Sequence, residues 1–161
     1  MVAFRDTLES LELPPDSLES ERMQSEIGRR GALLATAGLQ WQEHLGPLLT
    51  WQDAALLMAS VNTRQGVNDM VHRGRLLALR AEGGHLVYPL FQFHAGRPLP
   101  ALGDLLAAFR EVGVDAWTVA SWLVTPQDEL DGVTPVEWLK GGREPDRAVA
   151  AARHAAARLE R

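Results

Sequence analysis

The sequence predicts a mainly α-helical protein with one helix–turn–helix, a small β-hairpin wing behind it and a compact helical region after that. Three observations lead to this fold class. Apolar residues recur at helical spacing through most of the 161 residues, which buries one face of each helix. Residues 76–93 change to an alternating pattern around Gly83-Gly84, which is typical of two strands joined by a tight turn. After Pro98 the helical spacing returns in short stretches that glycine and proline separate.

The composition excludes several classes of protein. The chain is 46% hydrophobic and has 5 tryptophans, so it is not disordered as a whole. It has no cysteine, which excludes disulfides, cysteine nucleophiles and cysteine-ligated zinc. Residues 1–6 lack the basic start of a secretory signal, and no apolar stretch approaches the ~18 residues of a membrane-spanning helix. We therefore expect a cytoplasmic protein without membrane attachment.

The charge is unevenly distributed along the chain. The net charge is −5, but residues 50–97 carry five arginines against three carboxylates. A surface that contacts DNA would have to lie in this basic part. An excess of two positive charges is also within ordinary scatter, so charge alone leaves the question open.

Residues 1–48 are predicted to form an amino-terminal helical segment. A short stretch ends at Pro14-Pro15, and Asp16 and Glu19 then have capping-box spacing ahead of a longer helix. The apolar stripe of this helix includes small residues: Met23, Ile27, Gly31, Leu34, Gly38 and Trp41. Because small residues allow a second helix to approach closely, the segment is a candidate for dimerisation. Packing on its own domain is the alternative.

Residues 49–97 are predicted to form the winged helix–turn–helix. Thr50 and Thr63 are placed to cap two helices, with a turn at residues 59–62 between them. Gly74 is placed to end the second helix in the left-handed conformation. In the hairpin that follows, Pro89 is expected to demote part of the second strand to a sheet edge.

The second of these helices has a polar face that is suited to the major groove. Arginine pairs with guanine edges and Gln or Asn with adenine, while arginines on a wing hold the DNA backbone. The residues expected to bind DNA are Arg64, Gln65, Asn68, Arg73 and Arg75. Helix pairs of this kind without DNA contact are common, so a purely structural role is the alternative.

The segment Thr63-Arg64-Gln65-Gly66-Val67 through Gly74-Arg75-Leu76 resembles the winged helix–turn–helix of the MerR and excisionase type. The resemblance implies that the second helix is the recognition helix. Two features depart from the pattern: the turn before Thr63 is slightly longer, and Asp53 and Asp69 weaken the positive potential.

Motifs for catalysis are missing from the sequence. The five histidines are scattered, no glycine-rich loop ends in Lys-Ser or Lys-Thr, and no Gly-x-Ser-x-Gly elbow occurs. Asp128, Glu129 and Asp131 cluster in a turn-rich stretch, where solvated carboxylates are the simplest interpretation. We expect no enzyme, no metal and no cofactor, although a small enzyme or ligand-binding domain is a rival hypothesis.

Residues 98–161 contain the most specific pattern. It consists of Trp122-Leu123-Val124-Thr125-Pro126, then Leu130-Asp131-Gly132-Val133-Thr134-Pro135, then Trp138-Leu139. This order resembles the toxin-binding domain of the Xre/MbcA/ParS-like type II antitoxins. The resemblance implies a partner toxin of the RES-domain type, which consumes NAD, and repression of the protein's own operon. Many such antitoxins have an all-helical DNA-binding region, whereas residues 50–93 look winged.

The alanine-rich end, residues 146–161, is predicted to be a helix that stands clear of the core and blocks the toxin's active site. Packing as an ordinary terminal helix is the alternative. The residues expected to bind the toxin are Lys140, Arg143, Arg147, Arg153, Arg158 and Arg161. The hypothesis is thus an antitoxin and autorepressor that binds operator DNA as a homodimer or higher oligomer. The main alternative is a stand-alone transcription regulator whose carboxy-terminal domain only oligomerises.

Overall fold

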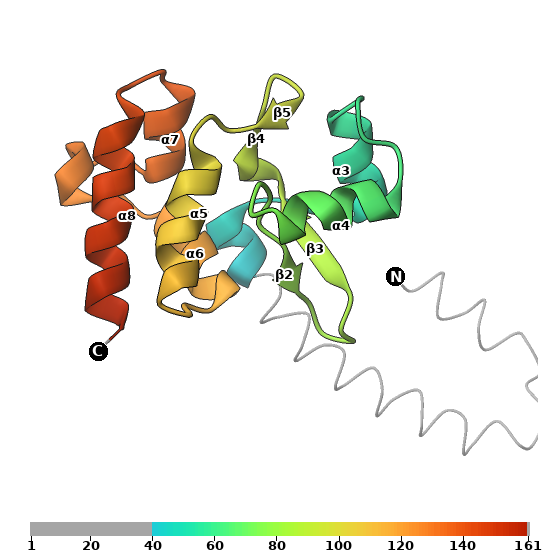
Figure 1. The fold of residues 1–161 in the computed structure, drawn as a ribbon, viewed down its shortest axis with the longest axis horizontal. Coiled ribbons are helices and arrows are strands. Elements are labelled where there is room, and N and C mark those ends of the chain that lie inside the picture. The colour runs from blue at the N-terminus through green and yellow to red at the C-terminus, as the bar shows by residue number, and fades with distance from the viewer. Residues whose placement is uncertain (1–39, 161) are drawn as a thin grey trace, which may run out of the picture. The chain divides into compact units, whose positions relative to one another are not determined.

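The computed structural model describes residues 40–160 (Figure 1). The helix and dimerisation surface expected in residues 1–39, and Arg161, lie outside the described residues. Residues 41–160 belong to one compact unit. The predicted functional regions 49–97 and 98–161 are both contained in it.

The described part is mainly helical with a small antiparallel sheet, which confirms the predicted fold class. Helical residues 40–45 come first. Then follow β1 (Leu48–Leu49), α3 (Trp51–Leu57), α4 (Arg64–His72), β2 (Leu79–Arg80) and β3 (Leu86–Pro89). After the short turn η1 (Leu90–Gln92) come β4 (Phe93–His94), β5 (Arg97–Pro98), α5 (Leu102–Glu111) and α6 (Ala116–Leu123). The last elements are η2 (Asp128–Leu130), α7 (Pro135–Lys140) and α8 (Pro145–Leu159).

The helices begin where capping chemistry predicts. The hydroxyls of Thr50, Thr63 and Thr134 accept from backbone N–H groups three residues on, at 3.0–3.2 Å. The Asp115 carboxylate accepts from the N–H groups of Trp117 and Thr118. Each cap satisfies donors that the first turn of a helix leaves unpaired, so these four boundaries are fixed by local sequence.

The hairpin is present, but its strands are shorter than predicted and its position in the sheet differs. β3 pairs with β2 through Leu79↔Val87 and with β1 through Leu49↔Tyr88. The prediction that Pro89 makes this an edge strand is therefore wrong, because β3 is the central strand. Pro89 is tolerated since it is the last residue of β3, and the N–H of Leu90 donates to the Pro47 carbonyl instead (3.0 Å).

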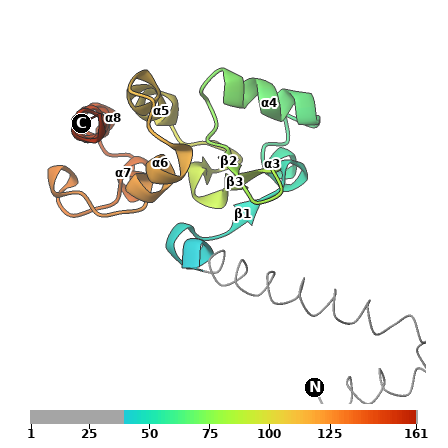
Figure 2. The ribbon, with the colours of Figure 1, turned by 90° about the horizontal axis from the view of Figure 1, so that it is seen from below.

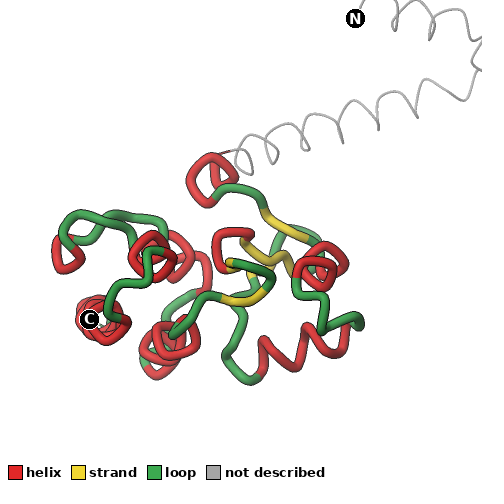
Figure 3. The backbone as a smooth tube through the Cα atoms, turned by 90° about the horizontal axis from the view of Figure 1, so that it is seen from above, coloured by secondary structure: helices red, strands yellow, loops and turns green. Residues whose placement is uncertain are grey.

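The strands lie between two groups of helices, α3 and α4 on one side and α5–α8 on the other (Figures 2 and 3). One core cluster joins α3 and α4 to the hairpin: Ala54, Ala55, Met58, Val67, Leu76, Tyr88 and Phe93. The larger cluster joins α5–α8 to residues before the boundary at 97, including Leu45, Leu79 and Phe91. Packing is therefore continuous between the two predicted regions.

Gln92 is a fully buried polar residue at the base of the hairpin. Its Oε1 accepts from the N–H of Leu77 (2.8 Å), and its Nε2 donates to the carbonyls of Leu77 (2.9 Å) and Pro89 (3.1 Å). Because buried polar groups are costly when unpaired, these bonds make one side chain the link between the chain entering β2 and the chain leaving β3.

The final helix packs on the core. One face of α8 is buried through five alanines: Ala148, Ala151, Ala152, Ala155 and Ala156. It lies against α5 and α7 (Figure 1). The prediction that this helix stands clear of the core is wrong, because methyl side chains on one face allow a close approach that hydrophobic spacing alone does not reveal.

Candidate nucleic-acid interface

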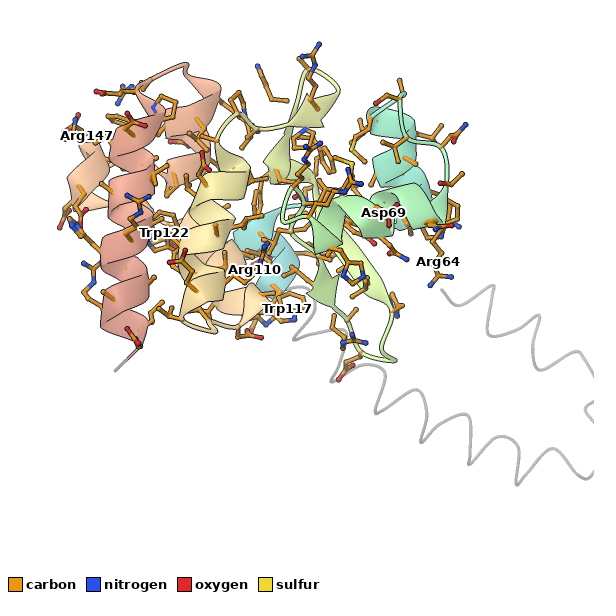
Figure 4. The ribbon with its side chains drawn as sticks, viewed as in Figure 1. Arg64, Asp69, Arg110, Trp117, Trp122 and Arg147 are labelled. Carbon is orange, nitrogen blue, oxygen red and sulfur yellow. The ribbon has the colours of Figure 1, made fainter. Side chains whose placement is uncertain are left out.

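Helix α4 presents one polar face to solvent. Val67 is its only fully buried residue, and the Thr63 cap and Gly74, at φ +71°, define where it starts and stops. Arg64 is exposed at its amino-terminal end and Asp69 further along (Figure 4). Gln65 and His72 are exposed as well. The helix is therefore held mainly at its ends and along a narrow apolar edge.

The structure places the five residues predicted to bind DNA on α4 or directly after it. Arg64, Gln65, Arg73 and Arg75 are exposed, and Asn68 is half-buried on the side of the helix that faces the hairpin. Asp69 lies on the exposed face between them, as its spacing predicts. A carboxylate there accepts from cytosine N4 and disfavours close phosphates.

Arg64 lies close to the hairpin as well as to solvent. With Asn68, His85 and Tyr88 it lines a cavity of about 180 Å³ at the start of α3. Burial raises the pKa of Tyr88 above its ordinary value of 10.0, and the positive charge of Arg64 opposes that shift. Their proximity has no signal in the sequence, since the two residues are brought together by the hairpin fold.

An open groove separates α4 from the hairpin and the start of α6. It has a volume of about 520 Å³, and its lining residues include Asn68 and His72 of α4, Arg80 of β2 and Trp117 of α6. The Arg80 guanidinium donates to the carbonyl of Gly84 at 3.1 Å, which ties it to the hairpin turn. Arg80 thus gives the wing a positive charge on the groove side.

The carboxy-terminal end of α4 meets the backbone of α5. A Cβ on Gly103 would lie 3.3 Å from the carbonyl of Gly74, and a Cβ on Gly74 would overlap the guanidinium of Arg110. Arg110 therefore places a positive charge at the negative end of the α4 dipole. The crossing of α4 and α5 therefore leaves little room for a side chain at either glycine.

The residues predicted to bind a toxin make contacts within the chain. The guanidinium groups of Arg143 and Arg147 lie 4.8 and 5.0 Å from the ring centre of Trp138. Arg147 also binds both carboxylate oxygens of Asp131, at 2.9 and 3.3 Å. Arg158 and His154 both contact Glu129, at 3.6 and 2.9 Å.

The structure brings only part of that predicted set together. Lys140, Arg143 and Arg147 come from the junction of α7 and α8, whereas Arg153 and Arg158 lie further along α8. All five are exposed. The turn-rich stretch predicts solvated carboxylates at Asp131 and Glu129, and their pairing across 16 or more positions has no signal in local spacing.

Within residues 40–160 no three His, Asp or Glu side chains come together in a way that could hold a metal ion. In the same residues no helix combines the length and apolar character needed to cross a membrane.

The order β1-α3-α4-β2-β3 defines a helix–turn–helix with a β-hairpin wing, built onto a helical region. A solved structure shares this fold: the NMR structure of Rv2175c, with a TM-score of 0.58 and 24% sequence identity, covering 68% of this chain and 81% of that one. At this identity the likeness shows the fold alone. No protein-family model and no curated protein matches the sequence.

Proposed function

We propose that the protein is a DNA-binding transcription regulator that inserts α4 into the major groove. The observation that carries the proposal is the polar face of α4, which is free of core contacts and flanked by a wing. A helix of this kind fits the width of the major groove.

The residues of this surface divide into two groups by the part of the DNA that each is expected to contact. Arg64, Gln65 and Asn68 lie in the first half of α4, the part of a recognition helix that contacts base edges. Arg73 and Arg75 flank the turn at the end of the helix, and Arg80 lies on the wing, where contact with phosphates is expected. The net positive charge of residues 50–97 suits such contacts.

The test is binding to the DNA upstream of the protein's own gene, measured by fluorescence anisotropy. The double variant Arg64→Ala, Arg73→Ala should bind at least tenfold more weakly, since one arginine–base contact is worth about 1–3 kcal/mol. The control is Lys140→Ala, Arg153→Ala, which removes the same charge from exposed positions far along the chain. Equal losses in both variants would show binding by overall charge and would remove α4 from the interface.

A second proposal is that the carboxy-terminal region neutralises a RES-domain toxin without catalysis of its own. The sequence pattern of residues 122–139 supports it, together with the exposed basic group Lys140, Arg143 and Arg147. Because α8 is packed, occlusion would be performed by this surface and not by a free helix. Co-expression with a RES-domain toxin encoded beside the gene should restore growth, and Lys140→Ala, Arg143→Ala should abolish the rescue.

The DNA-binding proposal includes a symmetric assembly, a homodimer or higher oligomer that binds two half-sites of an operator. Light scattering of the free protein measures its mass directly. A monomer that also binds single half-sites would contradict the symmetric assembly and leave the assignment of α4 intact.

A further inference from the structure

One tryptophan forms a hydrogen bond between the helical region and the outer strand of the wing. Trp117, in the first turn of α6, donates its indole N–H to the carbonyl of Arg80 at 3.1 Å, across 37 positions of sequence. Arg80 ends β2, which is an outer strand of the sheet. An outer strand has unpaired carbonyls on its free side, and the indole supplies a donor to one of them.

The ring of Trp117 is itself held in place by the helical residues 40–45. The rings of Trp41 and Trp117 have centres 5.0 Å apart and are tilted by 55°. One turn further along α6, Ser121 Oγ lies 2.8 Å from His44 Nε2, within hydrogen-bond distance. These two contacts hold the short helix along α6, and the indole N–H consequently stays directed at the Arg80 carbonyl.

The base of the wing packs against α4, because Val67 and Tyr88 belong to one buried cluster. Further out, a groove of about 520 Å³ lies open between α4 and the wing. β2 contributes only two residues to the ladder, and residues 82–85 of the turn are exposed. Trp117 therefore forms the far wall of the groove and contacts the wing where Arg80 begins the turn.

We infer that Trp117 is a positioning residue for DNA binding, because it holds Arg80 and the wing at the distance from α4 that the DNA backbone requires. The inference rests on the proposed function, since it assigns a role to the wing in binding. It also gives residues 98–161 a part in DNA recognition that is separate from any partner protein. Trp117 itself does not touch the DNA.

The test compares Trp117→Phe with Trp122→Phe. Phenylalanine at 117 keeps a ring against Trp41 and loses the donor to Arg80. Trp122 is also half-buried on α6, but its indole N–H has no hydrogen-bond partner, so its removal is a matched control. Both variants are measured by hydrogen exchange of hairpin amides 79–88 in the free protein, and by affinity for promoter DNA over a range of salt concentrations.

Trp117→Phe should accelerate exchange in the hairpin and weaken binding by about five- to tenfold, the effect of one lost hydrogen bond. The slope of log affinity against log salt should fall by about one, because the contact of Arg80 with a phosphate is lost. Trp122→Phe should leave all three unchanged. A general loss of stability would not change the salt slope.

Unchanged hairpin exchange in Trp117→Phe would overturn the inference whether or not the protein binds DNA. Faster exchange with unchanged affinity and slope would also overturn it, since the wing would then be mobile without consequence. If the parent protein bound no DNA at any salt concentration, the proposed function would fall and the positioning role with it, and the exchange data would still show whether Trp117 restrains the hairpin.

Discussion

Tyr88 is the one tyrosine of the chain, and it is 1% exposed. Its raised pKa means that the unfolded chain releases the phenolic proton at lower pH than the folded protein does. Tyr88 therefore does not lower the free energy of unfolding below pH 10.0. Above that pH, the free energy of unfolding declines as the pH rises through the folded-state pKa. Tyr88→Phe should remove this decline, as measured by urea unfolding on either side of pH 10.0.

Arg64 supplies an internal check on that assignment. Its positive charge lowers the pKa of Tyr88, so Arg64→Ala should shift tyrosinate formation, followed by ultraviolet absorbance, to higher pH. A shift to lower pH would mean that the two side chains do not interact as the structure places them.

Trp122 combines a large apolar ring with an unpaired donor. Its ring packs edge-on against Phe109 with centres 5.1 Å apart, and its indole N–H is buried without a partner. Trp122→Ala should reduce the free energy of unfolding by about 3 kcal/mol, the lower end for a large core residue because the ring is only half-buried. Trp122→Phe should cost less than about 1 kcal/mol, because the donor lost is unsatisfied.

Chemical denaturation of the two variants separates packing from hydrogen bonding at this position. Similar large losses in both would indicate that the indole N–H has a partner in solution. Helical spacing puts Trp122 on the same face as Val119, and in the structure its ring packs against the core while part of it stays exposed.

Helix α8 shows how far spacing predicts an element without predicting its packing. Its alanine content indicates a helix, and the helix is there. The sequence does not show that the buried alanines of α8 pack against α5. Ala152→Leu should cost about 1–3 kcal/mol through overpacking, whereas Ala150→Leu, at an exposed position, should be close to neutral.

Thermal unfolding of these two leucine variants tests whether α8 is packed closely on the core. An Ala152→Leu protein as stable as the parent would mean that α8 detaches readily and can act as a free terminal helix.

The short strands are the elements that sequence predicts least well. The hairpin of β2 and β3 is local, and Gly83-Gly84 marks its turn. β1, with two residues, pairs with a strand about 40 positions later, and β4 with β5 forms a second two-residue pair that the pattern did not indicate. Capped helices are specified by neighbours in the chain, whereas these pairs form only once the helices pack.

The distribution of charge over the whole chain determines how its affinity for DNA depends on salt. With a net charge of −5 and a basic part confined to residues 50–97, affinity should fall as salt rises. Arg75→Ala should lower affinity for all DNA sequences by a similar factor and make the salt slope shallower by about one. Titrations of specific and unrelated DNA at several salt concentrations measure both; a loss confined to the specific site would place Arg75 on a base.

The sequence predicts where the five candidate residues lie relative to α4. It does not predict the distant residues that surround them. All five predicted DNA contacts lie on or beside α4 because helical spacing and two boundary residues determine that face. The indole of Trp117, the charge of Arg110 and the proximity of Arg64 to Tyr88 come from distant parts of the chain. They depend on the packing of residues 41–160 as one unit.

The contact between Gly74 and Gly103 has a consequence for how binding preference can change during evolution. The two backbones approach so closely that a Cβ placed on Gly103 would lie 3.3 Å from the Gly74 carbonyl, and this crossing involves none of the side chains along the outer face of α4. Arg64, Gln65 and Asp69 can therefore be exchanged without tilting the helix. A lineage can acquire a new target sequence through such replacements while every copy still presents its helix in the same orientation.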